Sequence, residues 1–233
     1  MSDGLSALEQ ALRYRFNNRS LLEQALTHRS ASGGNNERLE YLGDGLLNFV
    51  IGEAAYLQWN RAPEGDLSRL RASLVCEDRL ARLAKGLKLS DYLRMGSGEL
   101  KSGGFRRESI LADALEAIIG AIYLDGGFAP ARETTLHLFA ELLTTLPQPE
   151  TLKDSKTRLQ EVLQADARPL PEYRVLSEHG PPHRRVFQVA CKLIDSGHET
   201  ESGGTSRKQA EQDAARLMYE KLKGEKLKGT TNA

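Results

Sequence analysis

Apolar side chains recur at helical spacing along the first two thirds of the chain. Two stretches carry the clearest pattern: Leu39, Leu42, Leu46, Leu47 and Val50 in one, and Leu111, Leu115, Ile118, Ile119 and Ile122 in the other. Spacings of three and four residues place such side chains on one face of a helix. Residues 5–145 are therefore predicted to be mostly helical. Residues 96–104 are rich in glycine but lack the spacing of a phosphate-binding P-loop, so we expect a mobile loop there.

The helical pattern stops at residues 146–150, which read Leu-Pro-Gln-Pro-Glu. Proline lacks a backbone N–H and disfavours helical geometry in the residue before it. Two prolines this close together predict an extended connection between two domains. We therefore expect a first domain over residues 1–146 and a linker over residues 147–152.

The remainder of the chain mixes helical spacing with strict alternation. The expected elements are a helix over residues 155–165, strands over residues 173–178, 187–193 and 198–201, and a closing helix over residues 207–222. Apolar and polar side chains alternate in the second strand, which predicts one buried face. The order α-β-β-β-α predicts an α+β domain over residues 153–223, followed by a flexible tail over residues 224–233.

Composition and charge narrow the class of protein. The chain has 233 residues, of which 39% are hydrophobic and 27% are charged, as in ordinary soluble domains. The net charge is zero, but residues 1–150 carry 17 basic and 20 acidic side chains, whereas residues 151–233 carry 15 basic and 12 acidic ones. This asymmetry is typical of an acidic, cation-using domain joined to a domain that binds a polyanion.

Several kinds of site and location are not expected. Cys76 and Cys191 lie far apart and in no C-x-x-C pattern, which disfavours a zinc site or a disulfide framework and fits a reducing compartment. No run approaches about 18 consecutive apolar residues, and the N-terminus lacks the pattern of a signal peptide. We therefore expect a cytoplasmic protein that does not span a membrane.

Two sets of carboxylates lie within the apolar helices. Glu37, Glu40 and Asp44 are spaced i, i+3 and i+7, which places them on one helix face. Asp113 and Glu116 share a face at i, i+3 in a segment that is otherwise almost purely apolar. Acidic side chains in a buried helix need a positive partner, and no Lys or Arg in that segment provides one.

A divalent cation held by both helices would provide the missing partner. Hard oxygen ligands without His or Cys nearby favour Mg²⁺, with Mn²⁺ as a possible substitute, over zinc. On the residues alone, two solvated acidic helix faces are an equally good interpretation.

The run from Asn36 to Asp44 (NERLEYLGD) resembles the signature of the ribonuclease III family at every position. Tyr41 is a mild departure, because bacterial members most often carry Phe there. The motif from Asp113 to Glu116 has the family's expected separation from the first, and Glu64 matches a further acidic position. The resemblance covers nearly the whole chain. It implies an all-α catalytic domain followed by an α+β double-stranded-RNA-binding domain.

The resemblance also implies a reaction and the residues that perform it. It assigns metal binding to Glu40, Asp113 and Glu116, and it links Asp44 and Glu116 most closely to catalysis. Glu37 and Glu64 would be secondary acidic positions that place the substrate or bind a second metal. The implied reaction is hydrolysis of double-stranded RNA with Mg²⁺ and no small-molecule cofactor, which leaves 5′-phosphate and 3′-hydroxyl ends. The implied substrates are ribosomal RNA precursors and structured messenger RNAs.

Glycines in the first motif suggest close packing. Gly43 and Gly45 each cost roughly 1 kcal/mol against alanine within a helix, so another backbone is expected to approach them. Members of the family are homodimers, and the resemblance places the ring of Tyr41 in the partner subunit; burial in its own core is the alternative. His28 also matches a family position, and we expect it to have a structural role.

The C-terminal domain carries the candidate RNA contacts. Ser206 is a good N-cap, and Arg207 and Lys208 then fall in a first helical turn, where the helix dipole disfavours cations. A bound phosphate would relieve that conflict. The resemblance adds further residues that would recognise the shape of the duplex: Thr157, Gln160, Glu161 and His183.

Two other functions were weighed against a nuclease. The first is a double-stranded-RNA-binding protein that does not cut, which the presence of Glu40, Asp44, Asp113 and Glu116 disfavours. The second is a metal-dependent nucleotide hydrolase, which leaves the C-terminal domain unexplained.

Overall fold

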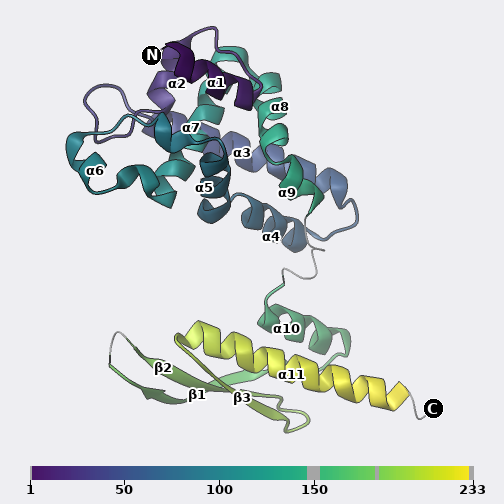
Figure 1. Ribbon diagram of the computed structural model, residues 1–233. Helices are drawn as coiled ribbons and strands as arrows, with labels where there is room; N and C mark the ends of the chain where they lie inside the picture. Colours follow the sequence, from purple (N-terminus) through teal and green to yellow (C-terminus); the bar gives the residue numbers. More distant parts are fainter. Residues whose placement is uncertain (1, 146–152, 182–183, 231–233) are drawn as a thin grey trace. The chain divides into compact units, whose positions relative to one another are not determined.

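The chain divides into two compact units, Met1–Leu152 and Lys153–Ala233 (Figure 1). The computed structural model describes residues 2–145, 153–181 and 184–230, and of residues 2, 3 and 225–230 it describes only the backbone. The expected linker, residues 147–152, therefore lies outside the described residues. Within the described parts of the chain, no helix is long and apolar enough to cross a membrane.

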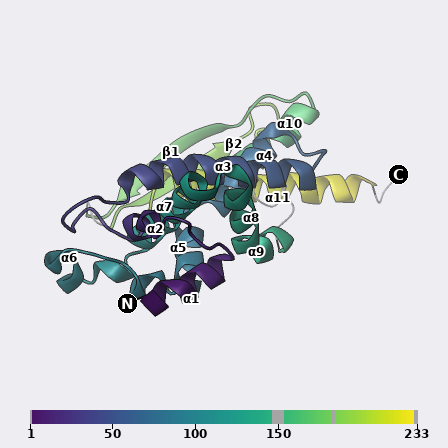
Figure 2. The same cartoon turned by 90° about the horizontal axis from the view of Figure 1, so that it is seen from above.

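The first unit is made of helices. They are α1 (Ser2–Leu12), α2 (Arg19–Ala25), α3 (Glu37–Gln58), α4 (Glu64–Leu74), α5 (Glu77–Gly86), α6 (Ser97–Lys101), α7 (Glu108–Gly126), α8 (Phe128–Leu138) and α9 (Ala140–Thr144), with short 3-10 turns η1 (Leu89–Asp91) and η2 (Gly104–Arg106). Helix α7 is buried along most of its length, because it is almost purely apolar apart from the face that carries Asp113 and Glu116. Figures 1 and 2 show α3 and α5 packed against α7 from different sides, so α7 forms the centre of the core.

Helices α3 and α7 cross at a pair of glycines. A Cβ atom on Gly43 would lie 1.8 Å from the carbonyl oxygen of Glu116, and one on Gly120 would lie 2.2 Å from the carbonyl oxygen of Leu39. Only glycine permits so close an approach of two backbones. The expected close contact is therefore confirmed for Gly43. It is wrong for Gly45 within this chain, because nothing lies within 4 Å of a Cβ placed there.

The glycine-rich segment 96–104 is not a simple loop, contrary to the expectation. It contains helix α6 and leads into η2. Its glycines serve specific contacts: a Cβ on Gly96 would lie 2.3 Å from the carbonyl oxygen of Ser30, and Gly103 adopts a left-handed conformation with φ of 78°. The composition therefore reflects a close approach and a turn.

The second unit confirms the order α-β-β-β-α. Its elements are α10 (Ser155–Ala165), β1 (Glu172–His179), β2 (Val186–Lys192), β3 (Glu199–Gly204) and α11 (Arg207–Thr230). The strands form an antiparallel sheet in the order β1-β2-β3, and α10 and α11 lie on one side of it (Figure 1). The core between the helices and the sheet contains Leu159, Leu163, Cys191, Leu193, Ala214 and Met218.

Two details of this unit differ from the expectation. Ala190 is buried although it falls on the expected polar face of β2, because its small side chain lies between the longer side chains of its cross-strand partners, Arg174 and Glu201. Helix α11 continues to Thr230 and takes in most of the expected tail. Residues 223–228 have no proline and, apart from Gly224, are good helix formers, so the helix can continue past Leu222.

Candidate active site

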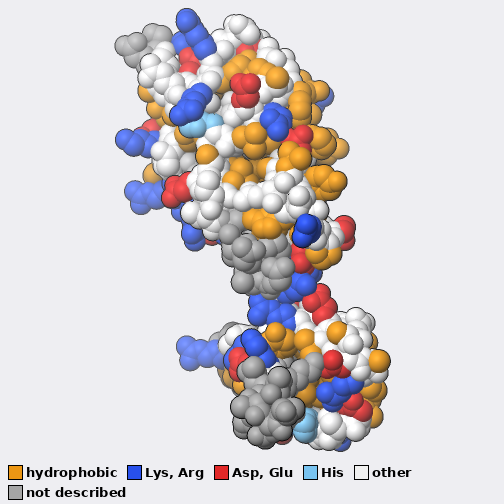
Figure 3. All heavy atoms as spheres, turned by 90° about the vertical axis from the view of Figure 1, so that its right-hand side faces the viewer, with side chains coloured by type: hydrophobic (Ala, Val, Ile, Leu, Met, Phe, Trp, Pro, Cys, Tyr) orange, Lys and Arg blue, Asp and Glu red, His pale blue; other side chains and the backbone are white. Residues whose placement is uncertain are grey.

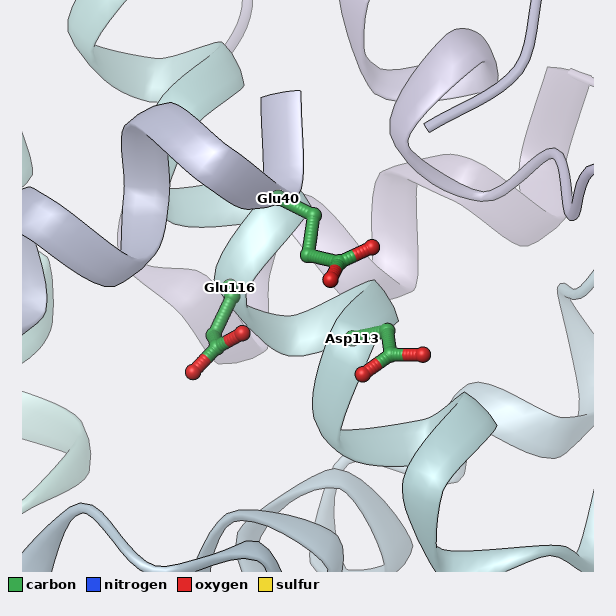
Figure 4. Close-up of side chains that lie close together, drawn as sticks. All are labelled: Glu40, Asp113 and Glu116. Carbon is green, nitrogen blue, oxygen red and sulfur yellow. The ribbon is translucent and has the colours of Figure 1, made fainter. Parts of the chain in front are cut away.

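Three carboxylates meet where α3 crosses α7. Glu40 projects from α3 toward Asp113 and Glu116 of α7 (Figure 4). One oxygen atom from each of the three side chains lies within 4.8 Å of the others. The close packing at Gly43 brings the two helices near enough for this convergence. Helical spacing places each side chain on its face, and the crossing brings the two faces together.

The electrostatics of this cluster call for a cation. Burial, together with the charges of Asp44, Asp113 and Glu40, raises the pKa of Glu116 from 4.5 to about 8. Burial also raises the pKa of Glu40 and of Asp113. Within the described residues, none of the three clustered side chains forms a hydrogen bond or a salt bridge. Three half-buried carboxyl groups without neighbouring donors fit a hard divalent cation such as Mg²⁺, which would hold them in the ionised form.

Asp44 and Glu37 flank the cluster on α3. Asp44 is exposed, and its Oδ1 accepts a 2.7 Å hydrogen bond from the side-chain amide of Asn48. Glu37 begins α3 and accepts a 2.9 Å hydrogen bond from the side-chain amide of Asn35. Both carboxylates contribute to the raised pKa of Glu40, so they add negative charge to the same site.

Glu64 does not join the cluster in this chain. It is the first residue of α4, which follows the far end of α3. Helix α3 has 22 residues and is therefore about 33 Å long. The carboxylate of Glu64 instead accepts a 2.7 Å hydrogen bond from Ser68 within its own helix.

Tyr41 is not part of its own core. Its side chain is 84% exposed, so the intramolecular alternative is wrong. Sequence reasoning missed the other large apolar side chains that are exposed among the described residues of this unit, which are Phe49, Tyr56, Leu57, Leu100, Leu124 and Phe128. The rings of Phe49 and Phe128 meet edge to face with centroids 5.8 Å apart. Figure 3 shows hydrophobic side chains gathered on one face of this unit. Helical spacing from Tyr41 through Phe49 to Tyr56 was the available signal.

In the second unit, basic side chains surround the start of α11. Ser206 caps this helix, because its Oγ accepts a 3.2 Å hydrogen bond from the N–H of Gln209. Arg207 and Lys208 follow as exposed residues of the first turn. A cavity of about 480 Å³ is lined by Ser206 and Arg207 together with Arg184 and Arg185. Sequence reasoning missed these last two arginines, because only the pairing of β2 with β3, in which Phe187 lies opposite Gly204, brings them to the helix start.

The other predicted RNA contacts lie on α10 or outside the described residues. Thr157 donates a hydrogen bond from Oγ1 to Asp154 (2.9 Å), and Gln160 and Glu161 are exposed. Glu161 accepts a 2.9 Å hydrogen bond from Lys153. His183 lies outside the described residues.

The sequence matches two family models. Residues 18–142 match a model described as Ribonuclease-III-like, and residues 155–222 match the double-stranded RNA binding motif. A protein named Ribonuclease 3 from Alkalilimnicola ehrlichii is 56% identical over 216 residues, which cover 93% of this chain and 95% of the relative. A Ribonuclease 3 from Pseudomonas aeruginosa is 55% identical over 215 residues, which cover 92% of this chain and 94% of the relative.

Solved structures from Campylobacter jejuni resemble the first unit. One describes structural flexibility in a region involved in dimer formation of the nuclease domain of ribonuclease III. That chain is 48% identical and has a TM-score of 0.57, and the match covers 58% of this chain and 95% of that chain. A second structure of the nuclease domain is 45% identical with a TM-score of 0.58, over 61% of this chain and 97% of that chain.

Proposed function

Because the chain belongs to the ribonuclease III family and is an endoribonuclease specific for double-stranded RNA, we propose that its acidic cluster hydrolyses phosphodiester bonds with Mg²⁺ and leaves 5′-phosphate and 3′-hydroxyl ends. The observation that carries this proposal is the convergence of Glu40, Asp113 and Glu116 within 4.8 Å. Mn²⁺ also prefers carboxylate oxygens, so it is expected to substitute.

Each acidic side chain has a proposed part in the reaction. Glu40, Asp113 and Glu116 would hold the cation through their converging oxygens. When bound, the cation supplies Lewis-acid stabilisation of the negative charge that develops around the reacting phosphate. Asn48 donates to Oδ1 of Asp44, and no described residue donates to Oδ2, so Oδ2 would accept the proton of the attacking water. The water oxygen forms a bond to phosphorus as the bond to the 3′ oxygen breaks, and that oxygen takes a proton from solvent.

The second unit binds double-stranded RNA, and we propose which residues touch it. Ser206, Arg207 and Lys208 would hold backbone phosphates at the start of α11, because the first N–H groups of a helix favour an anion. Arg207 would exchange its 2.8 Å salt bridge with Glu211 for this contact. Arg184 and Arg185 line the same cavity and would add to this contact. The proposed minor-groove contacts are Thr157, Gln160, Glu161 and His183.

We propose a homodimer that forms through the exposed apolar side chains of α3. Tyr41 and Phe49 are 84% and 59% exposed, which is unusual for rings so close to a well-formed core. A two-fold symmetric contact buries the same surface on both subunits. Glu64 lies beyond the other end of α3, so its proposed role in substrate placement requires a second subunit whose α3 runs antiparallel.

The proposed substrates are ribosomal RNA precursors and structured messenger RNAs of the cytoplasm. Duplex RNA is recognised by shape, which allows many substrates of different sequence. Cys76 and Cys191 are both free, which fits a reducing compartment.

The experiment that tests the reaction is incubation with a long RNA duplex, with and without Mg²⁺, followed by analysis of the ends. We expect cleavage only with the cation, and products with 5′-phosphate and 3′-hydroxyl ends. Cleavage in a chelator, or products with 5′-hydroxyl ends, would contradict the proposed chemistry.

A further inference from the structure

A cavity of about 510 Å³ opens beside the acidic cluster. Glu40 and Asp113 line it, but Glu116 does not, so the cavity extends from the α3–α7 crossing in one direction only. Its other walls carry the cationic side chains Arg29 and Arg107. A cavity of this size has room for part of a nucleotide next to the site of reaction.

Arg29 is the loosely held cation of this cavity. Among the described residues its one ion pair is a 3.7 Å contact with Glu37, and the two side chains are 71% and 53% exposed. An exposed pair at that distance contributes little and is readily exchanged for another partner. Arg29 nevertheless lines the same cavity as Glu40 and Asp113, and its positive charge lowers the pKa of both against the larger effect of burial.

Arg107, the other cationic side chain that lines the cavity, is held more firmly. It forms a 2.9 Å salt bridge with Glu99, and it also donates a hydrogen bond to Ser102. Glu99 is only 20% exposed, so this pair is partly shielded from solvent. Arg107 therefore shapes the cavity, whereas Arg29 is available to a ligand.

The backbone around Arg29 is fixed even though its side chain is exposed. The N–H of His28 donates to the carbonyl oxygen of Arg94 (2.9 Å), and the N–H of Gly96 donates to Oγ of Ser30 (3.0 Å). The imidazole Nδ1 of His28 in turn accepts a hydrogen bond from the N–H of Ser30 (3.2 Å). Contacts on both sides of Arg29 thus preorganise its position, which lowers the entropy lost when it binds.

We propose that this cavity binds a backbone phosphate of the RNA strand next to the bond that is cut, and that Arg29 is the residue that contacts it. The inference rests on the proposed function of the cluster. Once a divalent cation balances the carboxylates, Arg29 gains little from them, and an anion in the cavity becomes its best partner. A guanidinium offers a planar pair of donors that matches phosphate oxygens.

The test compares Arg29→Gln with Arg82→Gln. Arg82 is 73% exposed and pairs with an Asp78 that is 53% exposed, so it matches Arg29 in exposure and pairing but lies on α5. With a short RNA duplex at saturating Mg²⁺, we expect Arg29→Gln to raise KM by about 10-fold and to change kcat less. Arg82→Gln should stay within about 2-fold, and Arg29→Lys should recover part of the loss because it keeps the charge.

Metal binding separates a phosphate contact from a role in building the site. In calorimetric titrations of the free protein with Mn²⁺, Arg29→Gln should bind the ion as well as the wild type or more tightly, because a positive charge near the carboxylates is removed. If Arg29→Gln binds Mn²⁺ more weakly or has a lower Tm than the wild type, Arg29 has a structural role and the proposal is overturned. Unchanged KM and kcat in Arg29→Gln would also overturn it. If the wild type itself fails to cleave with Mg²⁺, the proposed function fails first.

Discussion

The carbonyl oxygen of Glu116 occupies the space that a side chain on Gly43 would need: a Cβ there would lie 1.8 Å from it. The same helix crossing holds Glu40 next to Glu116 and Asp113. Backbone packing and the proposed metal site therefore depend on one contact, so a change in the spacing of α3 and α7 should alter the separation of the carboxylates.

Gly43→Ala should separate the helices and damage both stability and activity. The added methyl group has to displace the backbone of α7, and overpacking of this kind typically costs about 1–3 kcal/mol. The free energy of unfolding and Mn²⁺ affinity should both fall. Gly45→Ala is the matched control, because a Cβ there meets nothing within 4 Å and alanine favours the helix. Equal effects of the two substitutions, measured by denaturant unfolding, would argue against the packing explanation.

Glu116→Gln should abolish cleavage and leave RNA binding nearly intact. The amide keeps the shape of the side chain but removes the charge that would hold the cation, whereas the RNA-binding unit is untouched. Glu108→Gln is the control on the same helix, because Glu108 pairs with Lys85 on the surface. Cleavage and gel-shift affinity are measured together at ordinary Mg²⁺. Full cleavage by Glu116→Gln would remove this residue from the proposed site.

The stability of the metal-free protein should decrease as pH rises toward 8. Folding raises the pKa of Glu116 from 4.5 to about 8, so the folded state binds a proton that the unfolded state has released. This contribution is fully present below about pH 4.5 and is lost as pH rises through about 8. Urea unfolding in a chelator should therefore give a falling midpoint over this window, and Glu116→Gln should reduce the slope.

A divalent cation should reverse this pH dependence. It favours the ionised carboxylates, so Mg²⁺ or Mn²⁺ should stabilise the protein more at pH 8 than at pH 6. If the urea unfolding midpoint in the chelator does not change with pH in either the wild type or Glu116→Gln, repulsion among the carboxylates does not destabilise the folded protein.

The limits of sequence reasoning follow from what each pattern encodes. Helical period fixed the faces of Glu40, Asp113 and Glu116, and the apolar surroundings of the last two marked them as unusual. The period does not say where two helices cross, so the role of Gly120 was invisible. Strand register was equally hidden, which is why Arg184 was missed beside the start of α11. The three-dimensional packing shows both: the crossing of α3 and α7 places Gly120 against Leu39, and the pairing of β2 with β3 places Arg184 beside α11.

Two-fold contact through α3 predicts that an acidic residue at its centre should dissociate the dimer. Phe49→Asp replaces an apolar side chain that is 59% exposed with a charged one. The dissociation constant of the variant's dimer should rise at least about 10-fold. Ile194→Asp is the control, because Ile194 is 57% exposed but belongs to the second unit. Sedimentation of the full chain is the measurement. A wild type that is monomeric at micromolar concentration would contradict the proposed interface.

Lys208→Ala should weaken binding to duplex RNA and flatten its dependence on salt. Each phosphate contact releases condensed counterions, so the loss of one contact should lower the log–log salt slope by about one unit or a little less. Sequence preference should hardly change, because the contact is to the backbone. Lys221→Ala, an exposed lysine farther along α11, is the control. Cleavage at low salt should survive and should fail earlier than in the wild type as salt rises. An unchanged slope would mean that Lys208 is simply solvated, and the phosphate contact at the start of α11 would have to be abandoned.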